Sequence, residues 1–245
     1  MDQPVNPVPT SVRAVVLLAS LGRPASDFDR LAADLAAAGF EPIALDPSDV
    51  VGAVADEPTL HDLAAAVVGE LDRRGLDRVH LVGHAFGQRL ARCVVADAPE
   101  RVDSLVMLAA GGLVHMEPEI ARSLLACFDP DLPPDEHLAH VRAVFFAAGN
   151  DERVWTDGWM RDVALAQSGA VQRTAPGEWT GVAADRVLVV QGLQDACAVP
   201  ANGRQYAAMH PDRVSLVEID GAGHALLPER PDAVSAAVVE FLSSR

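Results

Sequence analysis

The segment that most constrains the fold is residues 79–87, Val-His-Leu-Val-Gly-His-Ala-Phe-Gly. An apolar run of strand length leads into two glycines four positions apart, and a helical pattern of apolar residues follows over residues 86–96. Glycines permit a tight turn because they carry no Cβ. The pattern predicts a buried strand, a tight turn and a helix.

The same alternation recurs along the chain. Strand-like apolar runs occupy residues 14–19, 42–45, 78–82, 102–109, 186–191 and 214–219. Helical patterns occupy residues 27–38, 60–74, 86–96 and 231–242. Strands that alternate with helices predict an α/β fold, with a mostly parallel sheet of about six or more strands covered by helices on both faces.

Residues 111–181 interrupt this alternation. They contain no strand-like run of comparable strength, and helical patterns cover residues 117–128, 135–148 and 157–171. All three tryptophans, Trp155, Trp159 and Trp179, lie in this segment, as does Phe145. We predict a core formed by residues 1–110 and 182–245, and a helical lid formed by residues 111–181. The aromatic side chains would either line a pocket in part or form only the interior of the lid.

Charge and composition narrow the class of protein. The formal net charge of −16 disfavours a nucleic-acid partner, because phosphates require a basic surface. No apolar run reaches the roughly 18 residues of a membrane span, so no membrane partner is expected. All 19 basic residues are arginines, which excludes a Schiff-base lysine. We expect a monomer or homodimer that acts on a small molecule.

The cysteines and the first residues bear on cofactors and location. The three cysteines are widely spaced and indicate neither a disulfide framework nor a zinc site. Residues 1–13 lack the apolar centre of a signal peptide. We therefore expect no metal, no cofactor and a cytoplasmic location.

Three positions of chemical interest follow strand ends. Ala85 is the middle residue of the 83–87 turn, Asp195 follows the strand at 186–191, and His224 lies in a Gly-rich loop after the last strand. This placement predicts that His224 lies within hydrogen-bond reach of Asp195 and faces Ala85 across a pocket. Alternatively, Asp195 is a turn residue and His224 bonds to backbone.

This order resembles the α/β-hydrolase fold family, in which a Gly-x-Ser-x-Gly nucleophile turn precedes an acid and a histidine. The resemblance extends from about residue 13 to the end of the chain. It implies an α/β-hydrolase fold and an enzyme whose acid is Asp195 and whose histidine is His224. It also places two oxyanion-binding backbone N–H groups at Leu21 and Phe86.

The sequence departs from the family pattern at three places. Ala19 and Ser20 stand where the family usually has His-Gly, and residues 46–49 replace an Arg-Gly-x-Gly loop. Ala85 stands where the family has Ser, Cys or Asp. The string Gly-His-Ala-Phe-Gly-x-Arg resembles a bacterial subset in which alanine is the native residue. An engineered replacement of serine would give the same sequence.

Other side chains complete the predicted site. Ser20 and Cys197 are nucleophilic, but neither occupies the turn that aims a nucleophile. His84 is expected mainly to support structure. The substrate pocket is predicted to include Ser20, His84, Phe145, Trp155 and Trp159.

A base and an oxyanion hole can act without a serine hydroxyl. We therefore predict acid–base catalysis by His224 and Asp195 on a largely apolar small-molecule carbonyl compound. The reaction would be a lyase, cyclisation or carbon–carbon bond reaction, or a water-mediated hydrolysis. One alternative is a serine esterase or carbon–carbon hydrolase whose serine was replaced. The other is a non-catalytic ligand-binding protein, against which the presence of both Asp195 and His224 argues.

Overall fold

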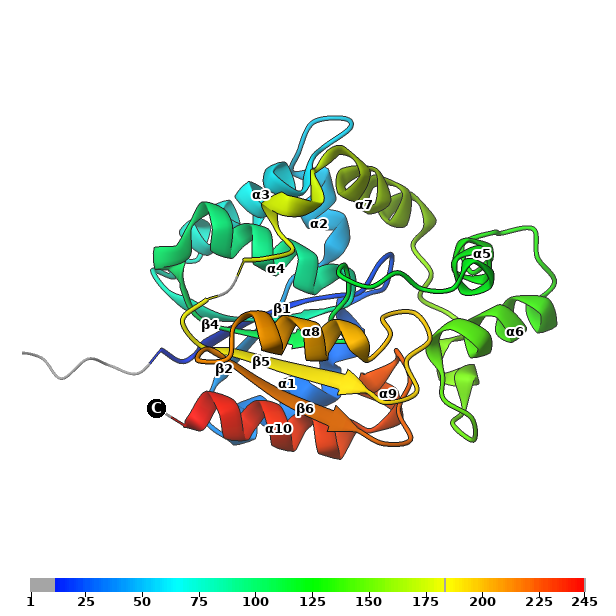
Figure 1. Ribbon diagram of the computed structural model, residues 1–245. Helices are drawn as coiled ribbons and strands as arrows, with labels where there is room; N and C mark the ends of the chain where they lie inside the picture. Colours follow the sequence, from blue (N-terminus) through cyan, green and yellow to red (C-terminus); the bar gives the residue numbers. More distant parts are fainter. Residues whose placement is uncertain (1–11, 183, 245) are drawn as a thin grey trace, which may run out of the picture.

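The computed structural model describes residues 12–182 and 184–244, in which six strands form one sheet (Figure 1). The strands are β1 (Ala14–Leu18), β2 (Glu41–Ala44), β3 (Val79–His84), β4 (Val102–Leu108), β5 (Val187–Gly192) and β6 (Val214–Ile219). Their order is β2-β1-β3-β4-β5-β6, and every neighbouring pair is parallel. The predicted fold class is confirmed, with strand ends within two residues of the expected positions.

Helices cover both faces of the sheet, and each face has its own apolar interior. One face carries α3 (Leu60–Arg73), α4 (Phe86–Asp97) and α8 (Ala201–Met209). The other carries α1 (Asp29–Ala37) and α10 (Pro231–Ser243). Val16 of β1 lies in the first interior and Val15 in the second, so the strand is buried on both sides. This explains why inner strands such as β1 are continuous apolar runs rather than alternating ones, whereas the edge strands β2 and β6 are only partly buried.

Three helices were not expected from the sequence. They are α2 (Pro47–Gly52), α8 and the short α9 (Leu226–Glu229). The α2 helix has a recognisable start, because Asp46 accepts a hydrogen bond from the Ser48 N–H and Pro47 occupies the first turn. By contrast, α8 contains Asn202 and Gly203, whose helix propensity is low, and packs against β5 and β6.

The strand order reverses between β1 and β3. From β1 the chain runs outward to the edge strand β2 and returns on the other side as β3, whose Gly83 pairs with Leu18. In open α/β sheets, ligands bind at the carboxyl ends of the strands where such a reversal occurs. The loop after β1 and the turn after β3 therefore meet at the edge of the sheet where a site is expected.

Residues 111–181 divide into two structural parts. The first contains α5 (Pro118–Ala126), α6 (Pro134–Phe145) and the 3₁₀ turn η3 (Glu152–Trp155), which share an apolar cluster of their own. The second contains α7 (Arg161–Arg173) and η4 (Pro176–Glu178), and α7 packs on α2 and α3 over the sheet (Figure 1). The described residues of this segment contain no strand. Its role as a lid stays a prediction.

Among the helices of residues 12–182 and 184–244, none combines the length and the apolar character needed to cross a bilayer.

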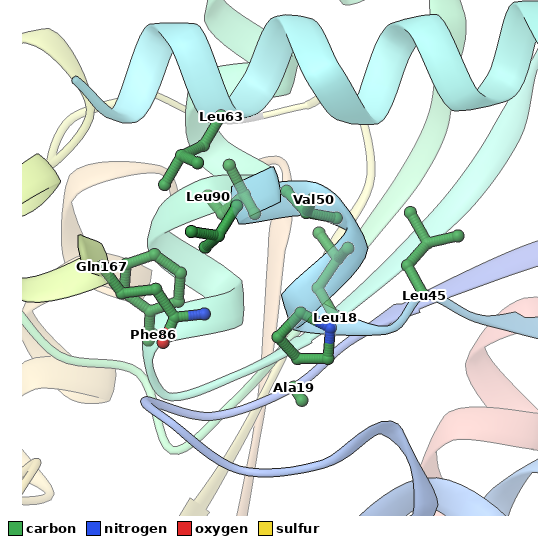
Figure 2. Close-up of a pocket in the computed structure, with 10 residues that line it drawn as sticks. Leu18, Ala19, Leu45, Val50, Leu63, Phe86, Leu90 and Gln167 are labelled. Atoms are coloured by element: carbon green, nitrogen blue, oxygen red, sulfur yellow. The ribbon is translucent and has the colours of Figure 1, made fainter. Parts of the chain in front are cut away.

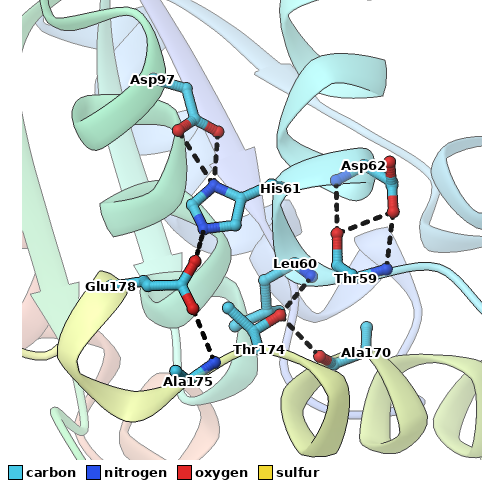
Figure 3. Close-up of polar contacts among 9 residues, drawn as sticks. All are labelled: Thr59, Leu60, His61, Asp62, Asp97, Ala170, Thr174, Ala175 and Glu178. Carbon is cyan, nitrogen blue, oxygen red and sulfur yellow. Dashed lines mark hydrogen bonds and ion pairs between the residues drawn. The ribbon is translucent and has the colours of Figure 1, made fainter.

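A polar cluster fastens the end of the second part to the core (Figure 3). His61 of α3 lies between two carboxylates, with Nδ1 2.8 Å from Asp97 Oδ2 and Nε2 2.9 Å from Glu178 Oε2. Beside it, Thr174 Oγ1 accepts a hydrogen bond from the Leu60 N–H at 2.8 Å. The Asp97 carboxylate, with a smaller contribution from Glu178, raises the pKa of His61. One imidazolium thus joins α3, α4 and η4.

This cluster predicts a pH-dependent contribution to stability. Because the pKa of His61 is raised on folding, its ion pairs contribute fully below the unfolded value of ~6.5 and are lost as the pH rises through the folded value. His61→Gln should lower the melting temperature by roughly 1–4 °C at pH 6 and by less at pH 9. Thermal melts followed by circular dichroism measure this, with His140→Gln as the control. An equal loss at both pH values would show that His61 acts without its charge.

Candidate active site

The turn between β3 and α4 holds Ala85 in an unusual backbone conformation. Its φ is 50° and its ψ is −103°, although alanine rarely adopts a positive φ. Two glycines make the turn possible. A Cβ on Gly87 would overlap the carbonyl oxygen of Leu18 in β1, and a Cβ on Gly83 would overlap the backbone of Gly87 and Gln88. The turn is thus pressed against the end of β1, and Ala85 is the N-cap residue that directly precedes α4.

His224 and Asp195 form a buried pair. His224 Nδ1 lies 2.9 Å from Asp195 Oδ2, and the two residues are 4% and 3% exposed. The other oxygen of Asp195 accepts the N–H groups of Cys197 and Ala198 at 2.9 and 2.7 Å. Gln191 Nε2 also donates to Asp195, at 3.2 Å. These contacts hold the carboxylate toward the imidazole.

The charge of His224 depends on its surroundings. Burial alone would lower the pKa of His224, but the Asp195 carboxylate and the neighbouring Cys197 thiol reverse this and raise it well above its ordinary value. Since an imidazole accepts a proton only in its neutral form, His224 becomes a base as the pH rises through that raised value.

His84 supports the His224 loop. His84 Nε2 lies 2.8 Å from the carbonyl oxygen of His224, to which it donates, and the two rings are 5.5 Å apart. Complete burial, together with the nearby charges of His224 and Arg23, lowers the pKa of His84 to about 3. His84 is therefore neutral near pH 7. Its Nδ1 has no hydrogen-bond partner among the described residues.

Two backbone N–H groups lie at the reversal of the strand order. Phe86 is the first residue of α4, whose N-terminus carries a partial positive charge. Leu21 lies in the loop after β1, where the Arg23 N–H donates to the Ser20 carbonyl oxygen at 3.1 Å and closes the turn. Ser20 itself is buried. This is the edge at which helix N-termini bind anionic groups in α/β proteins.

An aromatic wall stands beside the histidines. The Phe145 ring lies 5.6 Å from His224 and 5.2 Å from Trp155, and Trp155 lies 6.4 Å from His84. Trp159 packs against Phe145 at 5.6 Å. Trp179 is not part of this wall, because it is buried in the main core with the Arg92 guanidinium 4.9 Å from its ring.

Three polar residues near these groups were not foreseen in the sequence. Arg23, which is 3% exposed, pairs with Asp27 and lies 4.4 and 4.8 Å from the rings of Trp155 and Trp159. The other two are Glu229, which bonds the Gly223 N–H and the Ala147 N–H, both at 2.7 Å, and Gln167 of α7. Glu229 and Gln167 belong to no local motif, because they bond to backbone N–H groups, and the Arg23 contacts with Trp155 and Trp159 join residues more than 130 positions apart.

Residues 9–231 match the family described as alpha/beta hydrolase fold. The chain belongs to this family.

Relatives and solved structures agree with this assignment. The chain is 27% identical over 197 residues to the dihydrolipoyllysine-residue acetyltransferase component of the acetoin cleaving system of Cupriavidus necator, covering 75% of this chain and 51% of that protein. It therefore spans about half the length of that relative. It is 32% identical over 114 residues to 2-hydroxy-6-oxononadienedioate/2-hydroxy-6-oxononatrienedioate hydrolase 1 of Dechloromonas aromatica, covering 43% and 39%. Rv0554 of Mycobacterium tuberculosis has the same fold, with a TM-score of 0.78, 24% identity, and coverage of 95% of this chain and 90% of that one.

The Asp195–His224 pair predicts a measurable titration. Asp195→Asn should lower the pKa of His224, because the amide removes the negative charge that favours the imidazolium while burial continues to oppose it. An NMR pH titration of the His224 ring carbon and proton signals measures the shift. Asp220→Asn, at an exposed position outside the pair, is the matched control. An unchanged His224 titration in Asp195→Asn would contradict the assigned electrostatic coupling.

Proposed function

We propose that this chain is an enzyme of the α/β-hydrolase fold that works without a nucleophilic serine. Its reaction is proton transfer by His224, oriented by Asp195, on a largely apolar carbonyl compound. The observation that carries the proposal is the buried contact of 2.9 Å between the two side chains, in the same molecule as a turn with alanine at its centre.

The alanine defines which reactions are possible. A methyl group cannot attack a carbonyl, so no acyl-enzyme forms at residue 85. The strained backbone nevertheless remains, at a typical cost of ~1–3 kcal/mol. The turn still directs the start of α4 toward the site, and that use requires no hydroxyl.

The charge that develops on the substrate would be held by backbone. We assign the oxyanion hole to the N–H groups of Leu21 and Phe86, assisted by the N-terminal end of α4. Each donor of this kind typically stabilises the transition state by ~3 kcal/mol. Such a pair suits an enolate, in which the carbonyl oxygen becomes negative.

His224 supplies the proton transfer. In its neutral form, Nε2 takes a proton from the carbon beside the carbonyl, and the electron pair moves to the oxygen held by the two N–H groups. Asp195 stabilises the imidazolium through Nδ1. Return of the proton to another carbon gives isomerisation. In a cyclisation, the enolate carbon instead forms a bond to a second carbonyl carbon of the same molecule, and the oxygen of that carbonyl takes the proton. In a carbon–carbon bond cleavage, His224 takes the proton of a β-hydroxyl group, the bond breaks to leave an enolate held by the two N–H groups, and the proton is then given to the enolate carbon.

Water-mediated hydrolysis is a second candidate. It is favoured by the likeness to a relative that is named as a hydrolase of an oxo-dienedioate. Here His224 would take its proton from a water molecule, for which the small Ala85 side chain leaves room. The same two N–H groups would hold the tetrahedral oxyanion.

The aromatic wall supports an apolar substrate. Phe145, Trp155 and Trp159 lie on residues 111–181, which we propose as a lid over the histidines. The Arg23 guanidinium lies against the indoles of Trp155 and Trp159 and is paired with Asp27. The aromatic wall therefore presents ring surface and not a free charge.

Proton abstraction can be tested without knowing the natural substrate. The protein is incubated with small aliphatic and aromatic ketones and 1,3-diketones in D₂O, and deuterium uptake beside the carbonyl is followed by NMR. His224→Ala should lower the protein-dependent exchange by ~10²–10⁴-fold. Ala85→Ser should leave it unchanged, because the hydroxyl has no part in the transfer.

The opposite result identifies a disabled serine hydrolase. If Ala85→Ser raises ester or carbon–carbon bond hydrolysis by several orders of magnitude, with a burst of acyl-enzyme, the alanine has replaced a working nucleophile. If the panel shows no exchange that depends on His224, while ligands still bind, the chain is a binding protein.

A further inference from the structure

The first turns of α4 present two different sides. Phe86 and Leu90 point into a small apolar cavity that has room for about one water-sized group (Figure 2). Arg89 and Arg92 leave the helix on another side, toward the loop that follows β4. Arg92 donates to the carbonyl oxygen of Gly111 at 2.7 Å, and Arg89 Nη2 lies 3.8 Å from the position that a Cβ on Gly111 would take. The two guanidinium groups thus converge on this loop.

Arg89 has no counter-ion in the part of the chain that the structure describes. No hydrogen bond or ion pair of its guanidinium is found there, and the group lies 5.1 Å from the Trp179 ring. Burial lowers the pKa of Arg89, because desolvation disfavours the charged form. By contrast, the buried Arg23 is paired with Asp27. A partly desolvated cation is costly when it is unpaired, so Arg89 points to a ligand that supplies negative charge.

A second cation lies beside it. Arg92 is 1% exposed, and its guanidinium lies 4.9 Å from the same Trp179 ring. Its hydrogen-bond partners are uncharged, namely the carbonyl oxygens of Thr180 and Gly111 and the side-chain oxygen of Gln88. Arg92 Nε and Trp179 Nε1 are buried without a partner among the described residues. Because charges act over several ångströms in a medium of low dielectric constant, Arg92 adds to the attraction that Arg89 exerts on an anion.

An anion can reach Arg89 from outside the protein. Arg89 is partly exposed, and none of its nitrogens is among the completely buried unpaired atoms of residues 12–182 and 184–244. Arg89 also lies in the first turn of α4, and the side chains of a helix lean toward its N-terminal end. That end carries the Phe86 N–H of the proposed oxyanion hole. Arg89 is therefore the member of the pair that can contact a ligand.

The Arg89 guanidinium lies beside the loop that carries Asp195. Ala198 Cβ is 3.4 Å from the same point of the β4 loop, and the Ala198 N–H donates to Asp195 Oδ1 at 2.7 Å. Cys197, which precedes Ala198, is also partly exposed. Its thiol lies near both the Arg89 guanidinium and the His224 imidazole. One short side chain thus separates the unpaired cation from the proposed base.

We propose that Arg89 binds a carboxylate of the substrate, so that the substrate class is an oxo acid. The carbonyl oxygen of the oxo acid is held by the N–H groups of Leu21 and Phe86, and its carboxylate pairs with Arg89. This inference rests on the proposed function, because that function places a carbonyl beside His224. It adds a charged group by which the site distinguishes an acid from a neutral ketone of the same shape.

Matched pairs of ligands isolate the contribution of the carboxylate. Binding of 4-oxopentanoate and 5-oxohexanoate, and of their methyl esters, is measured by calorimetry at pH 8, where the acids are ionised. Arg89→Gln removes the charge of the side chain, whereas Arg89→Lys keeps it. Arg161→Gln, at an exposed position on α7, is the matched control. Melting temperatures establish whether each variant is folded.

The proposal predicts a specific pattern. In the wild type and in Arg161→Gln, at least one acid should bind more tightly than its ester by ~10–100-fold, as for one charge-assisted hydrogen bond. Arg89→Gln should remove this preference while retaining ester affinity, and Arg89→Lys should keep part of it. In NMR spectra of the wild type, the acid but not the ester should shift the Arg89 side-chain Nε–H signal, which tests the contact without any variant.

Two results would overturn the assignment of Arg89. One is an equal affinity of the wild type for each acid and its ester. The other is a preference for the acid that leaves the Arg89 Nε–H signal in place and persists in folded Arg89→Gln, because the carboxylate then binds elsewhere. Failure of the proposed function gives a different pattern, with a preference for the acid that depends on Arg89 but no deuterium exchange that depends on His224.

Discussion

The close approach between the β3–α4 turn and the end of β1 is the constraint on which the site depends. Gly83 and Gly87 allow it, because a Cβ on either would overlap neighbouring backbone. The approach forces residue 85 into its positive φ and brings the first N–H groups of α4 beside the loop that follows β1. The parallel register of Leu18 with Gly83 fixes both elements at the same level of the sheet.

The ionisable side chains around this turn differ in their charge. Asp195 favours the protonated form of His224. Burial keeps His84, the residue directly before Ala85, in its neutral form. Arg23 is neutralised by Asp27 and enclosed by two indoles. His224 can therefore carry a proton, whereas His84 only donates a hydrogen bond to a backbone carbonyl. The proposed proton transfer thus has one route, through His224.

The fold could be predicted from the sequence to a large extent. The four inner strands are buried on both faces, so they are largely apolar, and their alternation with helices leaves few topologies. The positions of Asp195 and His224 after strand ends could also be read, because the loops that follow parallel strands are local features. The bounds of α7 could not, since its start is fixed by contacts with the β1 loop rather than by a local capping residue.

The polar residues that hold the loops of the site could not be predicted from the sequence, for a related reason. Gln167 bonds a backbone N–H that lies 145 positions away, and Glu229 bonds one 82 positions away. Backbone groups carry no side-chain identity, so neither contact leaves a pattern in the sequence. Trp179 illustrates the same limit. It is close in sequence to Trp155 and Trp159, but it packs in the main core, whereas they belong to the apolar cluster of α5 and α6.

Glu229 has a mechanical consequence. Its two carboxylate oxygens hold the N–H of Gly223, just before His224, and the N–H of Ala147, just after α6. The Ala225 N–H adds a bond to the Phe145 carbonyl oxygen at 2.8 Å. If α6 belongs to a lid, as we propose, lifting it would therefore either cost these hydrogen bonds or move the loop that carries His224.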